Sequence, residues 1–337
     1  MSAKRIITVF GATGSQGGSV ARSFLEDPKL KGIWAVRAVT RDTTKEAAKK
    51  LENAGAQLVS ADLNDKASIV RVIRGADAVY AVTNYWEKMD MKHEIQQGKN
   101  IMDAVKVYIS HLSVSSTLID TKPSSQETQV PHVVWSSLPN ATEISRGQTP
   151  NVHHFDSKAA VEKYARGLKV PASFFMPGFY MSNITQGMLR LNLETNAYVL
   201  SMPVPSSTPI PVFNVADTGK WVKKMVLKPD QVIGKNILGA TKYQTPAEIL
   251  QDFKEAYPIG GSTASYFQLS ESMFMGILMR TGMPDFAARE TLENFLLMTH
   301  GGYFGGLTLD ESLKLVEETP TTWTDFMKTS GAFNDLS

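Results

Sequence analysis

The sequence contains no cysteine among its 337 residues. This absence excludes disulfide bonds, thiolate metal sites, iron–sulfur clusters, a cysteine nucleophile and prenylation. An excess of one charge is also missing, because 35 Lys and Arg stand against 33 Asp and Glu, which leaves a formal charge of +2. We therefore expect no metal site, no direct contact with nucleic acid and no membrane partner.

Long apolar runs are absent as well. No run reaches the roughly 18 apolar residues that a membrane-spanning helix needs. The apolar run near the N-terminus, IITVF, is too short for the core of a signal peptide and leads directly into a glycine turn. Together with the missing cysteine, these features predict a protein of the reducing cytoplasm, and a regulatory role would also allow the nucleus.

Apolar, β-branched runs alternate with helical patterns through the first half of the chain. The strand-like runs are RIITVF, WAVRAVTR, QLVSADL, DAVYAVTNYW, HVVWSSL and ASFFMPGFYM. Strands separated by helices predict βαβ units, a parallel sheet and helices on both of its faces. The length also allows a large core in one big domain or in two unequal ones.

The turn after the first run, FGATGSQGGSV, has the pattern G-x-x-G-x-x-G between a predicted strand and a predicted helix. Glycine permits a tight turn and lets backbone approach a pyrophosphate, while the start of the helix supplies N–H groups and positive dipole. We expect a dinucleotide to bind at Gly11, Thr13, Gly14, Gln16 and Gly17. A purely structural glycine turn is the alternative.

The end of the second strand, AVTRD, bears on which dinucleotide binds. Thr40 and Arg41 place a hydroxyl and a guanidinium where a site specific for NAD usually has a carboxylate. This favours NADP(H), with Arg41 on the 2′-phosphate and NAD as a possibility, since a shift of one residue would put Asp42 there instead. Arg41 as an ordinary solvated surface residue is the competing interpretation.

Polar and apolar residues follow the third and fourth strands at the edge where a ligand crevice forms. Asp62 and Leu63 are placed to contact the adenine, although this stretch also resembles a helix N-cap. Thr83 and Asn84 lie where the cofactor should pass the fourth strand.

The sixth strand is interrupted by Pro177 and a glycine. We expect this break to turn Phe179, Tyr180 and Asn183 toward the nicotinamide, with Pro177 beside them. Tyr180 is then a candidate acid in catalysis. Packing in the core is the alternative for this aromatic run.

Several of these motifs resemble the NmrA-like proteins, an atypical branch of the extended short-chain dehydrogenase/reductase superfamily. The resemblance covers residues 5 to about 328 and is carried by GATGSQGG, TRD, ADL, HFDSK, YFGGLTLDESLKL and PTTWTDFM. It implies a Rossmann domain, a smaller C-terminal domain and a cleft between them that binds NAD(P). Members divide between redox-sensing regulators and oxidoreductases encoded with fungal biosynthetic pathways.

From the pattern and the resemblance together we expect an α/β protein with an NAD(P)-binding Rossmann fold, a doubly wound parallel sheet, and a smaller C-terminal α+β domain. The Rossmann domain is expected over residues 1–182 and about 208–241. The smaller domain, for substrate or partner, is expected over 183–207 and 242–332.

The resemblance also implies roles for HFDSK. The wider superfamily uses Y-x-x-x-K and a serine, and here the spacing survives as His154 and Lys158 on one face of a helix. His154 is either a proton donor with a pKa near neutrality or a chemically idle residue of the cleft. Lys158 is expected to contact the cofactor ribose. Ser137, or Ser136 beside it, would fill the serine role, and Tyr180 would be the acid if His154 is idle.

Three further stretches carry structural predictions. The Ser- and Thr-rich residues 107–131 predict a mobile inserted loop after a helix ending near Lys106, and a translated intron over residues 107–129 is a second hypothesis. Asp217 and Thr245 are expected to cap helices. A helical pattern runs from Ser270 to about Thr299.

The sequence therefore predicts an NADP(H)-binding oxidoreductase that transfers hydride to or from a small carbonyl, enone or imine metabolite, as in a fungal biosynthetic pathway. The alternative is a non-catalytic NAD(P) redox sensor that regulates a protein partner such as a transcription factor. The partner is a small-molecule substrate in the first case and a regulated protein in the second.

Overall fold

A seven-stranded parallel sheet forms the centre of the computed structural model, which describes residues 3–118 and 131–336. The strands lie in the order β11-β6-β5-β4-β1-β2-β3. Their bounds are β1 Arg5–Val9, β2 Trp34–Thr40, β3 Gln57–Ser60, β4 Ala78–Ala81, β5 His132–Ser136, β6 Ala172–Pro177 and β11 Asn236–Gly239. This confirms the doubly wound Rossmann-type sheet, and its order reverses between β1 and β4, where ligands of such sheets bind.

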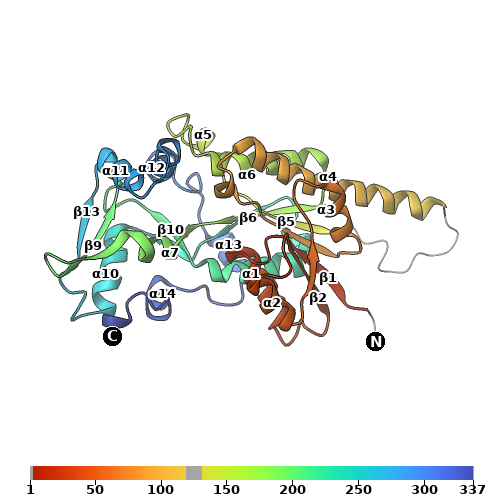
Figure 1. Ribbon diagram of the computed structural model, residues 1–337, viewed down its shortest axis with the longest axis horizontal. Helices are drawn as coiled ribbons and strands as arrows, with labels where there is room; N and C mark the ends of the chain where they lie inside the picture. Colours follow the sequence, from red (N-terminus) through yellow and green to blue (C-terminus); the bar gives the residue numbers. More distant parts are fainter. Residues whose placement is uncertain (1–2, 119–130, 337) are drawn as a thin grey trace.

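Helices cover both faces of this sheet (Figure 1). One layer contains α1 (Ser15–Leu25), α2 (Glu46–Asn53) and α8 (Thr218–Leu227), and its core includes the fully buried Trp221. The opposite layer contains α3 (Lys66–Ile73), α4 (Met91–Leu118) and α6 (His153–Leu168), and packs around Trp135. Strands β4, β5 and β6 are buried along their whole length, which explains why their apolar runs in the sequence are nearly continuous.

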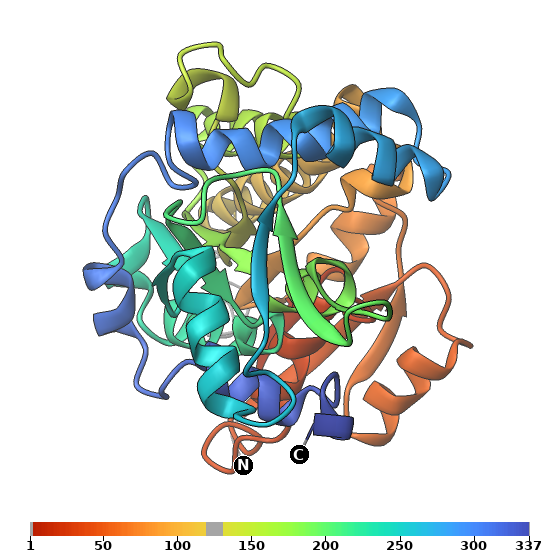
Figure 2. The same ribbon diagram turned by 90° about the vertical axis from the view of Figure 1, so that its left-hand side faces the viewer.

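The remaining elements form a smaller part at one end of the molecule, which faces the viewer in Figure 2. It has two three-stranded sheets, β12-β10-β7 and β13-β9-β8. Their strands are β7 Phe179–Tyr180, β8 Leu189–Asn192, β9 Ala197–Met202, β10 Ile210–Phe213, β12 Lys242–Gln244 and β13 Ser265–Gln268. The larger helices beside them are α10 Pro246–Ala256, α11 Glu271–Arg280, α12 Asp285–His300 and α14 Trp323–Thr329.

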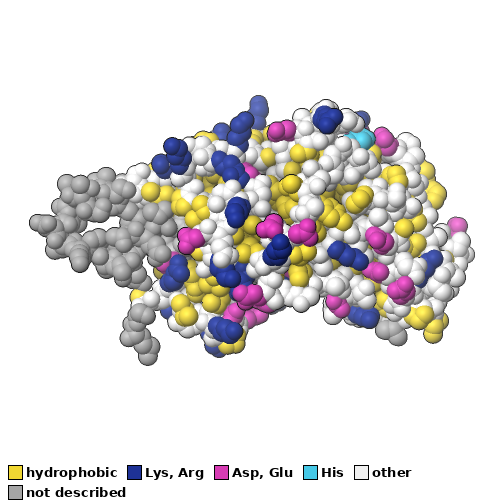
Figure 3. Space-filling model, turned by 180° about the vertical axis from the view of Figure 1, so that it is seen from behind, with side chains coloured by type: hydrophobic (Ala, Val, Ile, Leu, Met, Phe, Trp, Pro, Cys, Tyr) yellow, Lys and Arg dark blue, Asp and Glu magenta, His cyan; other side chains and the backbone are white. Residues whose placement is uncertain are grey.

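Short elements connect these parts. They are the helices α5 Ala141–Ile144, α7 Met181–Asn183, α9 Pro229–Val232 and α13 Asp310–Leu315, the 3-10 segments η1 Tyr85–Glu87, η3 Val215–Asp217 and η4 Asn334–Leu336, and the π-helical segment η2 Ile184–Met188. Lys and Arg side chains are interspersed with Asp and Glu over the face drawn in Figure 3, and hydrophobic side chains lie between them. That face therefore presents mixed charge rather than a field of one sign.

The predicted loop after Lys106 is wrong over its first part, because α4 continues to Leu118. The Tyr108 side chain is buried against the α3 layer, and its hydroxyl accepts a hydrogen bond of 3.0 Å from the Gly75 N–H. The Ser110 hydroxyl bonds back to the Lys106 carbonyl at 3.0 Å, so this serine is satisfied within the helix. Residues 119–130 lie outside the described part, and the intron hypothesis for 107–129 stays a prediction.

The helical pattern from Ser270 to Thr299 is two helices rather than one. The chain turns between α11 and α12 at Gly282, whose φ of +90° favours glycine, and Pro284 precedes the second helix. The predicted cap at Thr245 is confirmed, since its side chain and that of Glu248 form a reciprocal capping box at the start of α10.

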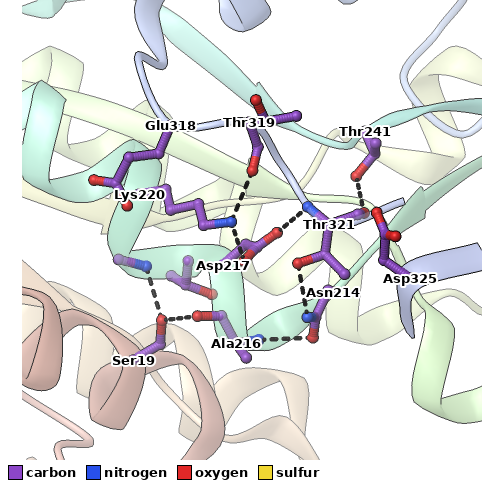
Figure 4. A network of polar contacts seen from close by, with 12 residues as sticks. Ser19, Asn214, Ala216, Asp217, Lys220, Thr241, Glu318, Thr319, Thr321 and Asp325 are labelled. Atoms are coloured by element: carbon purple, nitrogen blue, oxygen red, sulfur yellow. Dashed lines mark hydrogen bonds and ion pairs between the residues drawn. The ribbon is translucent and has the colours of Figure 1, made fainter. Parts of the chain in front are cut away.

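Asp217 stands at the start of α8, but its side chain does not cap that helix. One carboxylate oxygen instead accepts a 2.6 Å hydrogen bond from the Thr321 N–H, and the other lies 2.8 Å from the Lys220 ammonium (Figure 4). Thr241 donates to the Thr321 carbonyl at 2.8 Å. The PTTW motif thus fastens the C-terminal segment to α8, and the Trp323 indole extends the attachment by donating to the Ile249 carbonyl at 3.1 Å.

Replacing Asp217 with Ala should lower the free energy of unfolding by about 1–3 kcal/mol, because the half-buried Thr321 N–H and the Lys220 ammonium lose their acceptor. Urea denaturation followed by circular dichroism measures the change. Asp230→Ala removes an exposed carboxylate from the neighbouring α9 and serves as the control. Equal unfolding midpoints for the two variants would show that the attachment of the C-terminal segment through Asp217 contributes little to the free energy of unfolding.

Candidate active site

A cavity of about 930 Å³ opens at the carboxyl edge of the central sheet. Sixteen of the seventeen residues predicted for a site line it, namely Gly11, Thr13, Gly14, Gln16, Gly17, Arg41, Asp62, Leu63, Thr83, Asn84, His154, Lys158, Pro177, Phe179, Tyr180 and Asn183. The cavity lies at the switch point between β1 and β4 and extends to α12 of the smaller part. The sequence motifs therefore converge on one space, and the exceptions are Ser137 and its predicted alternative Ser136, which are absent from the cavity lining.

The glycine turn brings backbone close to backbone at the start of α1. Gly11 has a φ of +63°, which favours glycine. A Cβ on Gly17 would lie 2.3 Å from the Gly11 carbonyl oxygen, so only glycine fits there. Gly14 gives α1 no side-chain cap. The N–H groups of the first helical turn thus face the cavity edge without a competing side chain, as an anion-binding turn requires.

Gln16 organises the polar centre of the cavity. Its amide nitrogen donates to the Tyr180 hydroxyl at 2.7 Å, and its amide oxygen accepts from Tyr80 at 2.6 Å and from Ser136 at 2.8 Å. Burial raises the pKa of Tyr180 to about 12. Tyr180 therefore keeps its proton at neutral pH, and since its oxygen accepts from Gln16, its O–H is free to donate to a ligand.

Ser137 does not reach the cavity. Its hydroxyl donates to the Glu162 carboxylate of α6 at 2.6 Å, and the residue is fully buried. Successive residues at the end of a strand point to opposite faces, so Ser136 meets Gln16 while Ser137 turns into the helix layer. The geometry gives Ser137 a structural partner in place of the substrate.

Arg41 lies just after β2 in the cavity wall. Its guanidinium makes two bonds to the Glu87 carboxylate, 2.5 Å from Nη1 and 3.0 Å from Nη2. The neighbouring Asp42 carboxylate accepts from the N–H and the hydroxyl of Thr44, at 2.9 and 2.6 Å. Asp42 is thus engaged by its own turn, while Arg41 lines the cavity together with Lys45.

Asp62 also forms a local turn, because its carboxylate accepts from the Asn64 N–H at 2.8 Å. The N-cap of α3 is Asp65, which accepts from the Ala67 N–H at 3.0 Å. The alternative of Asp62 as an N-cap is therefore wrong, and Asp62 lies in the cavity wall beside Leu63.

His154 begins a buried polar network at the junction of the two parts. Its Nδ1 lies 2.6 Å from Glu290 Oε1, and its backbone N–H donates to the same oxygen at 2.8 Å. The Tyr85 hydroxyl donates to Glu290 Oε2 at 2.6 Å. Glu290 is fully buried in α12, and as a carboxylate it accepts from all three donors. Nδ1 therefore carries the proton toward Glu290, and Nε2 is the ring nitrogen left for a ligand.

Two opposing effects set the protonation of His154. Burial lowers its pKa below 6.5 and is the larger effect, while the hydrogen bond and the negative charge of Glu290 act in the other direction. At neutral pH His154 is mainly uncharged and its Nε2 is an acceptor. When it takes up a second proton, Glu290 is in place to stabilise the imidazolium.

Lys158 lies one helical turn from His154 on α6. Its ammonium donates to Glu94 Oε1 at 2.6 Å, and Glu94 is only 1% exposed. Thr83 donates to the same carboxylate oxygen at 2.7 Å, and Ser157 bonds to the other. The pair fixes Lys158 in the cavity wall, and the remaining N–H groups of the ammonium can donate to a ligand.

The end of the cavity beyond His154 is mostly apolar and aromatic. Its walls are formed by Trp86, Leu138, Phe155, Phe179, Met188, Met283, Phe295 and Tyr303, with Thr291 and Asn294 as polar members. The Asn294 Oδ1 atom is buried, and none of the described residues donates a hydrogen bond to it. The aromatic and apolar walls suit an apolar, planar molecule.

Sequence reasoning missed Tyr85, Glu87, Glu94 and Glu290. Tyr85 follows the predicted Thr83–Asn84 contact directly and Glu87 lies two residues further on, so the strand end gave a signal for this segment. Glu94 and Glu290 lie inside ordinary helical patterns, 64 and 136 residues from the side chains that they hold. Neither has a local signal in the sequence.

Among the described residues, no group of three or more His, Asp or Glu side chains is arranged to hold a metal ion. Within residues 3–118 and 131–336, no helix combines the length and the apolar character needed to cross a membrane.

The central sheet, the glycine turn and the switch-point cavity define a doubly wound α/β protein of the Rossmann type. The chain belongs to the NmrA-like family, which its residues 3–327 match. The NmrA-like family domain-containing oxidoreductase malD of Malbranchea aurantiaca is 32% identical over 79% of this chain and 76% of its own. The oxidoreductase cpsB of Aspergillus campestris is 27% identical over 98% of this chain and 91% of its own.

Solved structures agree in fold. NmrA, a negative transcriptional regulator, in complex with NADP superposes with a TM-score of 0.74 at 19% identity, covering 97% of this chain and 95% of its own. The NADPH-dependent quinone oxidoreductase QOR2 of Escherichia coli, complexed with NADPH, gives a TM-score of 0.71 at 19% identity, over 97% and 100% of the two chains. At such identities the likeness concerns the fold.

Proposed function

We propose that the protein is an NADP(H)-dependent oxidoreductase that transfers hydride to or from a carbonyl, enone or imine carbon of a small, largely apolar molecule. One observation carries the proposal: a single cavity joins the glycine turn, with its uncapped helix start, to a histidine held by a buried carboxylate. The first feature suits a dinucleotide and the second suits proton transfer.

The residues present fit an NADP(H) molecule along the cavity. The glycine turn and the first turn of α1 would hold the pyrophosphate, and Arg41 with Lys45 would hold the 2′-phosphate. Lys158, fixed by Glu94, would donate to the ribose next to the nicotinamide. The bound cofactor would supply the hydride.

His154 moves the proton that accompanies the hydride. In the direction of reduction, protonated Nε2 gives its proton to the substrate oxygen or nitrogen, and Glu290 stabilises the charge on the ring until then. In the direction of oxidation, neutral Nε2 accepts the proton of the alcohol or amine. Tyr180 is the second donor in the cavity and would serve an enone whose oxygen lies closer to Gln16.

The relatives support this choice. The fungal relatives malD and cpsB are named as oxidoreductases, and the two solved structures carry NADP and NADPH. A related NmrA structure carries NAD, which keeps NAD as a second cofactor for this chain. A role in a fungal biosynthetic pathway remains part of the proposal.

The alternative is a redox sensor, for which the regulator NmrA is the structural neighbour. A sensor needs the cofactor contacts but no proton-transfer group. The carboxylate behind His154 therefore favours the enzyme. A wild-type protein that binds NADPH, oxidises it with no carbonyl, enone, imine or quinone, and changes its affinity for a protein partner with the cofactor would establish the sensor instead.

Replacing Arg41 with Ala should weaken NADPH binding by about 10- to 100-fold and NADH binding by less than about 3-fold, because only NADPH loses a charge-assisted phosphate contact. Fluorescence titration of both cofactors measures the two affinities. Arg280→Ala, at an exposed position of α11 that does not line the cavity, is the control. Equal losses for the two cofactors would remove the case for a 2′-phosphate site at Arg41.

A further inference from the structure

The ion pair between Arg41 and Glu87 occupies the part of the cavity assigned to the 2′-phosphate. Arg41 follows β2 and Glu87 ends η1 after β4, and both side chains line the cavity. The two parallel N–H···O bonds, of 2.5 and 3.0 Å, use the fork of the guanidinium. A phosphate would use the same fork in the same way.

We propose that Glu87 is a specificity-determining residue, because its carboxylate and the 2′-phosphate of NADP(H) compete for the Arg41 guanidinium. NAD(H) has a hydroxyl at that position and does not enter the competition. Glu87 thus sets how strongly the cavity prefers NADP(H) over NAD(H). The inference rests on the proposed function, which assigns a nicotinamide dinucleotide to this cavity.

The ion pair is of a kind that a ligand can displace. The Arg41 side chain is 66% exposed and that of Glu87 is 38% exposed. Exposed pairs contribute little net free energy, since water solvates both partners when they separate. The exchange therefore requires no buried charge to be left without a partner.

The backbone of η1 can stay in place while Glu87 moves. Tyr85, at the other end of this segment, is buried, and its hydroxyl is held by Glu290 at 2.6 Å. The Met89 N–H donates to the Tyr85 carbonyl at 2.7 Å and closes the turn. A rotation of the Glu87 side chain is enough to release the guanidinium, and the His154 end of the cavity keeps its geometry.

Two effects of Glu87 act in the same direction. The carboxylate occupies the donors that the phosphate needs, and after displacement its negative charge remains near a group that carries about two negative charges. Neutralising Glu87 removes both effects. Lys45, which also lines the cavity, would be the second cation for the phosphate.

Isothermal titration calorimetry of the full chain with two small nucleotides tests the inference without catalysis. Adenosine 2′,5′-bisphosphate and 5′-AMP differ only by the 2′-phosphate. Glu87→Gln should bind the bisphosphate about 3- to 10-fold more tightly than wild type and leave 5′-AMP within about 2-fold. Glu52→Gln removes the same charge from an exposed position of α2 outside the cavity, and should change neither affinity.

The outcomes separate the inference from the proposed function. Three results for Glu87→Gln would overturn the role of Glu87 as a competitor. They are an unchanged affinity for the bisphosphate, a lowered affinity for it, and an equal rise in the affinities for both nucleotides. Lowered affinity would mean that Glu87 positions Arg41 for the phosphate. If one of these outcomes occurs while the wild-type protein binds NADPH and both nucleotides, only the inference about Glu87 fails and the proposed function stands. A wild-type protein that binds none of them overturns both. Thermal unfolding of each variant confirms that the comparison is between folded proteins.

Discussion

His154→Ala should lower the turnover of NADPH-dependent reduction by about 10²- to 10⁴-fold and leave the affinity for NADPH within about 3-fold. The imidazole is the group that Glu290 holds at the junction of the two parts, whereas the glycine turn follows β1 and Arg41 follows β2. The variant thus loses proton transfer and keeps the cofactor contacts. Stopped-flow single turnover and fluorescence titration measure the two quantities separately.

The pH dependence of the reduction rate provides a second test of the role of His154. Since burial holds the pKa of His154 below 6.5, the protonated form needed for reduction disappears as the pH rises through that pKa. The reduction rate should therefore fall with rising pH, by up to tenfold per pH unit. This falling limb of the pH–rate profile should be absent in His154→Ala. Glu290→Gln removes the negative charge that raises the pKa of His154, so it should shift the limb to lower pH.

His153→Ala is the matched control for this experiment. His153 is the neighbouring residue of α6 and does not line the cavity. Its replacement should leave turnover and the pH profile unchanged. If His154→Ala has the turnover of the wild type, His154 is not the proton donor and Tyr180 becomes the candidate. Its pKa of about 12 predicts that it keeps its proton through the neutral pH range.

Much of the fold could be predicted because it depends on local patterns. Runs of apolar residues buried on both faces predicted the parallel strands, and the glycine spacing fixed the turn between β1 and α1. The end of α4 could not be predicted, since its Ser- and Thr-rich sequence has weak helical periodicity. The first turn of the α4 extension after Lys106 is stabilised by a tertiary contact, namely the packing of Tyr108 and its hydrogen bond to Gly75.

The residues of the site likewise divide into those that local sequence patterns predicted and those that depend on tertiary contacts. Residues at strand ends were predictable, because the carboxyl edge of a parallel sheet brings them together whatever the loops do. Ser137 was misplaced because a shift of one residue in a strand reverses the direction of the side chain. Glu94 and Glu290 were missed because their roles arise only from helix packing across 64 and 136 residues of sequence.

Gly17→Ala should weaken NADPH binding by about 100-fold or more, the largest loss expected at the cofactor end of the cavity. The added methyl group would lie 2.3 Å from the Gly11 carbonyl oxygen and 2.5 Å from its carbon. These are backbone atoms, so no side chain can move aside. The turn must open instead, and with it the 2.9 Å bond from the Gly14 N–H to the Gly11 carbonyl.

Gly18→Ala is the graded control in the same helical turn. Its methyl group would meet the Ala12 carbonyl oxygen at 3.2 Å, a contact that a small shift relieves. We expect a loss of NADPH affinity below about 5-fold there, and for Gly17→Ala an additional fall of about 1–3 kcal/mol in the free energy of unfolding. Fluorescence titration and urea denaturation measure both variants. A folded Gly17→Ala protein that binds NADPH as tightly as Gly18→Ala would show that the pyrophosphate lies elsewhere, since a turn forced away from α1 could no longer present its N–H groups to the ligand.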